Sequence, residues 1–236
     1  TAWLSRPKKS RPQLIMWYIH QPDSWGQKLG PDNKELIPKI QYLDSLVGIF
    51  YNKINSLPIR DSINVVITSD HGMGKISQQK IEMIDNYVKK EWLRRSTGSN
   101  PIFMFEPRAE YFDSVYTNLK KAHHLSIWKK SEIPENLHYG NHPNIMPIVA
   151  LADRAWSIDW SENINNKYSG GTHGYDPRNR DMHAIFYAFG PNFKSNFKYK
   201  AFENIHFYEL MCALLNINPS TNDGNFEAIK NILKPD

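Results

Sequence analysis

The chain has 236 residues, 40% hydrophobic and 22% charged, which is ordinary for a globular protein with a core of its own. No stretch approaches the ~18 consecutive apolar residues of a membrane-spanning helix, and a single cysteine excludes an internal disulfide. The net charge is +5, and the Lys and Arg doublets are scattered without a regular aromatic pattern, which argues against dedicated nucleic-acid binding.

Strand-like and helix-like runs alternate along the chain, which indicates an α/β fold. The candidate strands are residues 13–20, 63–69, 101–106, 124–129, 146–158 and 183–189. An apolar stripe with steps of three and four predicts a helix over 36–57. Shorter apolar stripes predict further helices near 79–95, 111–119, 207–216 and 226–233. All of these stripes are expected to face a core.

The first strand-like run leads into a turn that carries one carboxylate. The apolar residues 14–19 are typical of a buried strand. The segment that follows is rich in Pro and Gly and holds Asp23.

The second such turn follows the apolar run 64–69 and contains Asp70, His71 and Gly72. An Asp–His pair at the end of a buried strand puts a hard oxygen beside a borderline nitrogen, the donors that a zinc-like ion takes. Carboxyl ends of strands are also where ligands bind in open α/β sheets. The alternative is a structural turn in which Asp70 caps and His71 packs.

The third turn is a glycine-rich segment, residues 169–177, with a single histidine, His173. It precedes another apolar run, residues 183–191. Flanking glycines let the backbone approach a ligand closely. The alternative is an ordinary surface residue, which is the more frequent role of a lone histidine in a loop.

Turns carrying Asp, Asp–His and His in this order resemble the nucleotide pyrophosphatase/phosphodiesterase family (type I phosphodiesterases), a branch of the alkaline phosphatase superfamily. The resemblance runs from near residue 3 to the C-terminus through a series of family phrases. These lie at residues 23–31, 69–73, 137–139, 171–174, 187–194, 202–205 and 210–215. It implies an alkaline-phosphatase-like fold in which helices flank both faces of a sheet (α/β/α).

In that family two zinc ions flank the scissile phosphate, so the resemblance implies two divalent cations as cofactors. Asp70 and His71 would bind one ion, and Asp23 and His173 would bind the other. The family pattern has a histidine four residues after the first Asp, where this chain has Gln27. A neutral amide oxygen is a poor zinc ligand, so we expect the second site to be weakened or changed in metal preference.

The family's nucleophile is a threonine that follows an early strand, and it has no counterpart in this chain. An early Asp that ligates metal in the family is also missing, and both would precede Thr1. The resemblance therefore predicts that residues 1–236 are the C-terminal half of a phosphodiesterase catalytic domain. This half alone is expected to be inactive.

The resemblance implies that the intact parent hydrolyses phosphodiester or pyrophosphate bonds of nucleotide-like small molecules through that threonine. It also implies an extracytoplasmic location, periplasmic or secreted. Two alternatives stay open. One is a sister chemistry of the superfamily, namely phosphomonoester or sulfate hydrolysis or phosphomutase activity. The other is a degenerate family member that acts as a binding or scaffold protein, for which Gln27 and the missing nucleophile are the best evidence.

Overall fold

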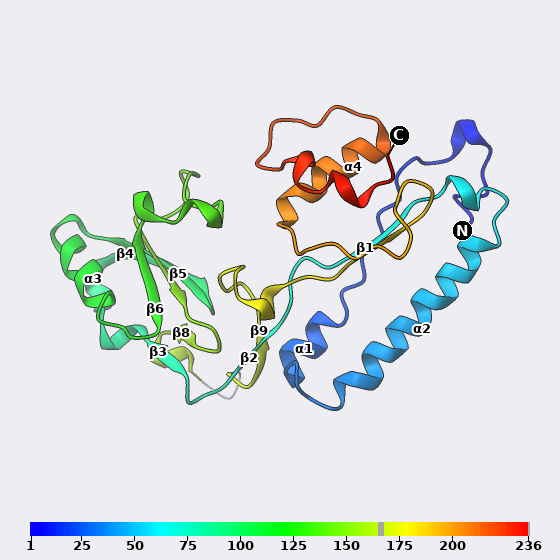
Figure 1. The fold of residues 1–236 in the computed structure, drawn as a ribbon. Helices are drawn as coiled ribbons and strands as arrows, with labels where there is room; N and C mark the ends of the chain where they lie inside the picture. Colours follow the sequence, from blue (N-terminus) through cyan, green and yellow to red (C-terminus); the bar gives the residue numbers. More distant parts are fainter. Residues whose placement is uncertain (165–167, 236) are drawn as a thin grey trace. The chain divides into compact units, whose positions relative to one another are not determined.

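The computed structural model describes residues 1–164 and 168–235, which form two compact units of mixed α/β content (Figure 1). Unit 1 comprises Thr1–Ile19, Gln41–Asp70 and Ile185–Asp236. Unit 2 comprises His20–Ile40 and His71–Ala184. No helix in the described ranges is long and apolar enough to cross a membrane.

Unit 2 is built on a four-stranded antiparallel sheet. Its strands, in spatial order, are β4 (Leu93–Ser99), β5 (Ile102–Pro107), β7 (Ile148–Ala152) and β6 (Leu125–Lys129). Only two residues connect β4 to β5, a length that joins antiparallel strands. All residues of β7 are buried, which explains why its sequence is a continuous apolar run.

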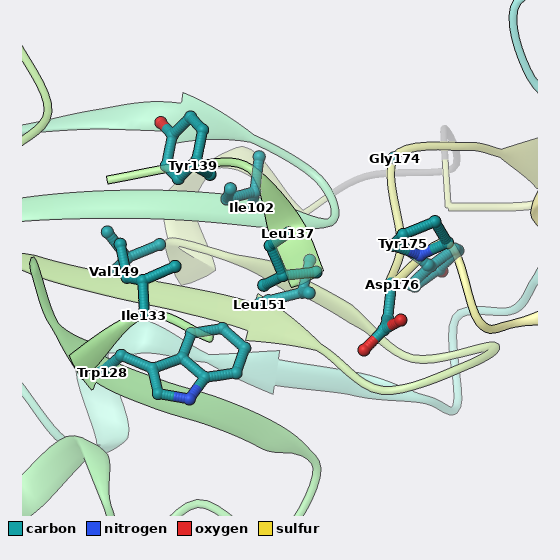
Figure 2. A pocket seen from close by; sticks show the side chains of 11 residues that line it. Ile102, Trp128, Ile133, Leu137, Tyr139, Val149, Leu151, Gly174, Tyr175 and Asp176 are labelled. Atoms are coloured by element: carbon teal, nitrogen blue, oxygen red, sulfur yellow. The ribbon is translucent and has the colours of Figure 1, made fainter. Parts of the chain in front are cut away.

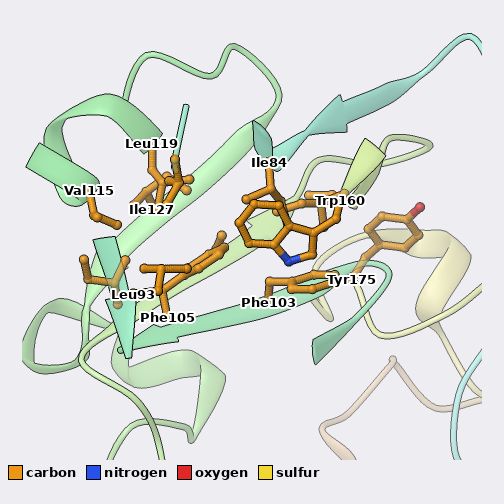
Figure 3. Packing of buried hydrophobic residues seen from close by; sticks show 14 of the residues in the cluster. Ile84, Leu93, Phe103, Phe105, Val115, Leu119, Ile127, Trp160 and Tyr175 are labelled. Atoms are coloured by element: carbon orange, nitrogen blue, oxygen red, sulfur yellow. The ribbon is translucent and has the colours of Figure 1, made fainter. Parts of the chain in front are cut away.

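The core of unit 2 lies between this sheet and its neighbouring elements (Figure 3). Helix α3 (Phe112–Leu119) packs against β6 and buries Val115 and Leu119 completely. Strand β5 alternates between buried and half-buried residues, with Phe105 fully buried. That period of two is the pattern of a strand with one face on a core.

Three short elements of unit 2 carry or support the candidate site. Strand β2 (Gly74–Ile76) pairs antiparallel with β9 (Gly170–Thr172), and helix α1 (Asp23–Leu29) packs against β9. A further pair, β3 (Ile81–Met83) with β8 (Ser157–Asp159), is parallel.

Unit 1 contains the antiparallel pair β1 (Val65–Thr68) and β10 (Phe186–Phe189). Helix α2 (Leu36–Asn55) belongs to unit 1 from Gln41 onward, and its first five residues belong to unit 2. Helix α4 (Phe207–Leu215) lies wholly in unit 1. A small buried cluster lies around α4 and consists of Phe193, Leu210, Ile229 and Ile232.

Several predicted elements are confirmed. The strands expected at 63–69, 101–106, 124–129 and 183–189 are β1, β5, β6 and β10. The helices expected at 36–57, 111–119 and 207–216 are α2, α3 and α4. The predicted strand 146–158 is two strands, β7 and β8, because a turn at residues 153–156 separates them.

The strand predicted at 13–20 is wrong: this segment forms no strand. Met16, Trp17 and Tyr18 are 86%, 71% and 80% exposed. The physical reason is that an apolar run becomes a strand only when another strand takes up its backbone hydrogen bonds, and no described residue pairs with it.

The helix predicted near 79–95 is also wrong. This segment forms β3, two 3₁₀ turns and the start of β4. Ile84 and Val88 are buried as expected, but pairing of β3 with β8 sets the backbone conformation. Tertiary pairing here overrides a helical spacing of apolar residues.

Three smaller corrections follow. The Pro/Gly-rich turn after residue 20 contains helix α1, and residues 226–233 form two short 3₁₀ turns instead of an α-helix. The stripe of α2 faces a core only in part, because Ile37 and Ile40 are exposed while Leu36 and Ile54 are buried. The strands of the described residues form four separate small sheets, so the mixed α/β content is confirmed, and the single sheet with helices on both faces stays a prediction.

Candidate metal centre

Helix α1 places Asp23 and Gln27 on one face, four residues apart. Asp23 opens the helix, where the helix dipole favours a negative charge. The Gln27 amide nitrogen Nε2 donates a hydrogen bond of 2.8 Å to Asp23 Oδ2. Asp23, a predicted ligand of the second cation position, and Gln27, the doubtful one, therefore contact each other.

The glycines of β9 bring His173 against this helix. A Cβ at Gly170, whose φ is +108°, would collide with the backbone carbonyl of Gln27. The glycines therefore let β9 pack closely on the backbone of α1. The sequence alone suggested instead a close approach of the backbone to a ligand. As a result, His173 Nε2 lies 3.7 Å from Asp23 Oδ1 and 3.3 Å from Gln27 Nε2.

His71 is held by its own neighbour, Gly72. The backbone N–H of Gly72 donates to Met182 O at 3.0 Å, and a Cβ at Gly72 would overlap the carbonyl oxygen of Asp181. His71 Nδ1 lies 2.8 Å from Gly72 O. Because a carbonyl oxygen only accepts, His71 Nδ1 is the donor in this contact, so Nε2 is the ring nitrogen that would ligate a metal.

The three side chains converge in unit 2. The rings of His71 and His173 stack with their centroids 3.5 Å apart and an angle of 11° between the planes. Ligand atoms of Asp23, His71 and His173 all lie within 4.8 Å of one another. Asp23 Oδ1 is buried and has no hydrogen-bond partner among the described residues. Two imidazoles and a carboxylate are donors that zinc-like ions take.

Asp70 is placed differently from the other predicted ligands. It follows β1 as the last residue of a unit 1 segment, and His71 begins a unit 2 segment. The three-residue group of unit 2 does not include it. Its role as a ligand stays a prediction.

Sequence reasoning missed the residues that support His71. The 3₁₀ turn Arg180–Met182 abuts Gly72, and Arg154 grips Asp181 through two hydrogen bonds of 2.7 and 2.8 Å. Asn179 caps that turn, since its side chain accepts a hydrogen bond from the backbone N–H of Asp181. The Asn179-x-Asp181 spacing was the available signal for a capped turn.

An apolar cavity of about 160 Å³ shares the loop of His173 (Figure 2). Residues 174–177 form one wall, and the sheet side chains Ile102, Trp128, Val149 and Leu151 form another. A cavity of this size has room for about one aromatic ring. Hydrogen bonds from Arg178 to the carboxylate hold the pKa of Asp176, at this wall, below its ordinary value.

Comparison with known proteins gives a consistent picture. A family model described as type I phosphodiesterase / nucleotide pyrophosphatase matches residues 1–176. Ectonucleotide pyrophosphatase/phosphodiesterase family member 7 of Mus musculus is 34% identical over 227 residues, which is 94% of this chain and 51% of that protein. Family member 5 of Homo sapiens is 34% identical over 232 residues, 98% of this chain and 48% of that protein. The chain thus spans about half the length of these relatives.

Solved structures agree with the sequence relatives. Murine ectonucleotide pyrophosphatase/phosphodiesterase 5 aligns with a TM-score of 0.90 and 33% identity, over 98% of this chain and 61% of that one. An inactive threonine-to-alanine variant of that protein, in complex with AMP, aligns with a TM-score of 0.89 and 32% identity.

Proposed function

Because the chain belongs to the type I phosphodiesterase / nucleotide pyrophosphatase family, we propose that it supplies cation ligands to a hydrolase. The substrates are phosphodiesters or pyrophosphates of nucleotide-like molecules. The observation that carries the proposal is the parallel stack of His71 and His173 beside Asp23. AMP in the murine relative supports a nucleotide-like substrate.

The stack is consistent with two cations. Each imidazole would supply one ring nitrogen as a ligand. The ring centroids lie 3.5 Å apart, so the two rings are near enough to serve two neighbouring cations, as in two-metal hydrolytic sites. On the family resemblance, we propose that Asp70 and His71 would hold one ion and that Asp23 and His173, with Gln27 as a weak ligand, would hold the other.

The cations, zinc in the first instance, would stabilise charge on the attacking and leaving oxygens. This chain's residues orient the ligand side chains. Gly72 O fixes the ring of His71, and the close packing of β9 on α1 places His173 beside Asp23. We propose that the nucleophile is a threonine outside these 236 residues. The chain alone would bind cations without enzymatic turnover, because losing a positioned nucleophile forfeits a proximity advantage that can reach ~7–11 kcal/mol.

The test is hydrolysis of p-nitrophenyl thymidine monophosphate by the full-length protein. Removal of metal by a chelator should abolish activity, and zinc should restore it. His173→Ala should lower kcat by at least about 100-fold, as expected for loss of a metal ligand that positions charge. His123→Ala is the matched control, since His123 is an exposed histidine of the same unit. Activity that survives the chelator, or that falls equally in both variants, would contradict the proposal.

Gln27 favours a second candidate function, a family member that binds phosphodiesters without turnover. A neutral amide at a position that the family fills with histidine weakens the grip on a soft cation. The same assay separates the two candidates when binding of AMP is measured alongside it. Metal-dependent AMP binding without hydrolysis would support the second.

We also propose an extracytoplasmic location for the intact protein. The support is that its relatives are named ectonucleotide pyrophosphatases/phosphodiesterases. Accessibility of the native protein to a membrane-impermeant label on intact cells tests this.

A further inference from the structure

We propose that the position formed by Asp23, Gln27 and His173 is an exchangeable site for a hard divalent cation such as Mn²⁺. The Gln27 amide contacts both other ligand residues of this position and competes with a cation for them. The inference rests on the proposed function, because it assumes that these side chains face a cation at all. It goes further in naming the class of ion and the residue that controls its entry.

One nitrogen atom of Gln27 contacts both neighbouring ligand residues. Nε2 donates to Asp23 Oδ2 at 2.8 Å and lies 3.3 Å from His173 Nε2. An amide nitrogen only donates, so His173 Nε2 acts as the acceptor and carries a lone pair toward Gln27. A carboxylate oxygen and an imidazole lone pair are also what a cation would take from these two residues. The amide therefore holds the same partners as the ion and competes with it.

Cation binding requires the amide to change its orientation. Rotation about the terminal side-chain bond exchanges Nε2 for Oε1, which turns a donor toward the site into a neutral oxygen ligand. Both hydrogen bonds of Nε2 are given up in this rotation. A cation at this position consequently binds less tightly than it would to ligands with no competing donor, and it exchanges more readily.

The position nevertheless keeps a ligand suited to a cation. Asp23 Oδ1 is buried and has no hydrogen-bond partner among the described residues, so Gln27 engages only one of the two carboxylate oxygens. A buried carboxylate oxygen without a hydrogen bond is costly, and a cation beside it would remove that cost. The position is therefore weakened by Gln27 and not abolished.

The donor set after rotation contains two oxygens and one nitrogen. Carboxylate and carbonyl oxygens suit Mg²⁺, Ca²⁺ and Mn²⁺, whereas imidazole suits zinc. Among these ions Mn²⁺ tolerates one imidazole beside oxygen ligands. An imidazole at position 27 would reverse the balance in favour of zinc, and a carboxylate would strengthen the preference for hard ions.

The experiment measures cation binding by the metal-free, full-length protein, with no activity readout. Zinc is titrated calorimetrically, and Mn²⁺ binding to the zinc-loaded protein is followed through the electron paramagnetic resonance signal of free Mn²⁺. We expect one zinc to bind tightly and the second position to take Mn²⁺. Gln27→His should raise the affinity for a second zinc by about 10- to 100-fold, the scale of changes next to a metal. Gln27→Glu should raise Mn²⁺ affinity by at least about 10-fold, since a carboxylate cannot donate to Asp23.

Gln79→His is the matched control, because Gln79 is an exposed glutamine of the same unit, and it should change neither affinity. Two equally tight zinc ions in the unmodified protein, or no Mn²⁺ binding to its zinc-loaded form, would overturn the inference. So would changes under about 3-fold in both Gln27 variants. Failure of the proposed function looks different: the cations bind as described, but no phosphodiester is hydrolysed.

Discussion

Apolar runs behave differently in the two units. In unit 2, strand β5 is paired along both edges, and its Phe103 and Phe105 are buried. In unit 1, the equally apolar residues 14–19 form no strand, and Tyr187 of the two-stranded pair β1–β10 is 68% exposed. An apolar pattern thus indicates a segment that can form a strand. Whether it does so depends on a second strand that pairs with it.

The sharpest test of this contrast compares large-to-small substitutions in the two units. Phe105→Ala should lower the free energy of unfolding by about 3–5 kcal/mol, because Phe105 is fully buried in a packed core. Trp17→Ala should change it by no more than about 0.5 kcal/mol, since Trp17 is 71% exposed. Chemical denaturation followed by circular dichroism measures both. A loss above about 2 kcal/mol in Trp17→Ala would break the comparison, since truncating an exposed side chain rarely costs that much.

A second contrast uses one substitution with opposite signs in the two units. Gly72→Ala should destabilise unit 2 by about 1–3 kcal/mol, because the new Cβ overlaps the carbonyl of Asp181. Gly48→Ala should stabilise α2 by about 0.5–1 kcal/mol, since nothing lies within 4 Å of its new Cβ and alanine is the better helix former. Thermal unfolding of both variants checks the signs. If Gly72→Ala leaves the stability unchanged, the 3₁₀ turn beside Gly72 can move away from the new Cβ.

Helices and strands were predictable where the local apolar pattern favours the same secondary structure that packing and strand pairing require. Helices α3 and α4 carry strong apolar stripes, and β5, β6 and β7 are short apolar runs that pair with one another. Helix α1 was not predictable, because Pro22, Gly26 and Gly30 look like turn residues. The structure supplies the reason for one of them: Gly26 is buried, and a Cβ there would press on the side chain of Met73.

The candidate site was predictable only at its chemically conspicuous residues. Asp23, His71 and His173 were identified because each stands in a turn after or before an apolar run. The sequence does not reveal that Gln27 bonds to two of the ligand residues, since that depends on the turn after residue 20 being a helix. It also does not reveal Arg154, which acts from a distant part of the chain on Asp181.

A third test concerns a hydrogen-bonded tyrosine of unit 2 and its effect on how the free energy of unfolding depends on pH. Burial and a hydrogen bond of 2.6 Å to Glu82 raise the pKa of Tyr87 to about 12. The folded state thus holds this proton more tightly than the unfolded state, so the stabilisation is complete below pH ~10 and is lost as pH rises toward 12. Tyr87→Phe should flatten the fall in unfolding free energy over that window. An unchanged pH profile would show that Tyr87 ionises normally.

The smallest change in the free energy of unfolding is expected for an ion pair at the surface. The same ion pair is expected to influence cation binding at the candidate metal centre. Arg154 grips both oxygens of Asp181, but its side chain is 67% exposed, so Arg154→Met should cost no more than about 1 kcal/mol. The same substitution should weaken cation binding by about 10-fold, because Asp181 packs on Gly72, whose carbonyl orients His71.

Arg95→Met is the control that isolates this positioning effect. The Arg95–Glu106 ion pair lies between β4 and β5 of the same unit, and the Arg95 side chain is similarly exposed at 64%. Its loss should cost a comparable amount of stability and leave cation affinity unchanged. If calorimetry finds equal affinity losses in both variants, the weakening reflects general loosening of unit 2, and the Arg154–Asp181 pair does not position His71. A loss confined to Arg154→Met means that the Arg154–Asp181 pair positions His71 through Gly72.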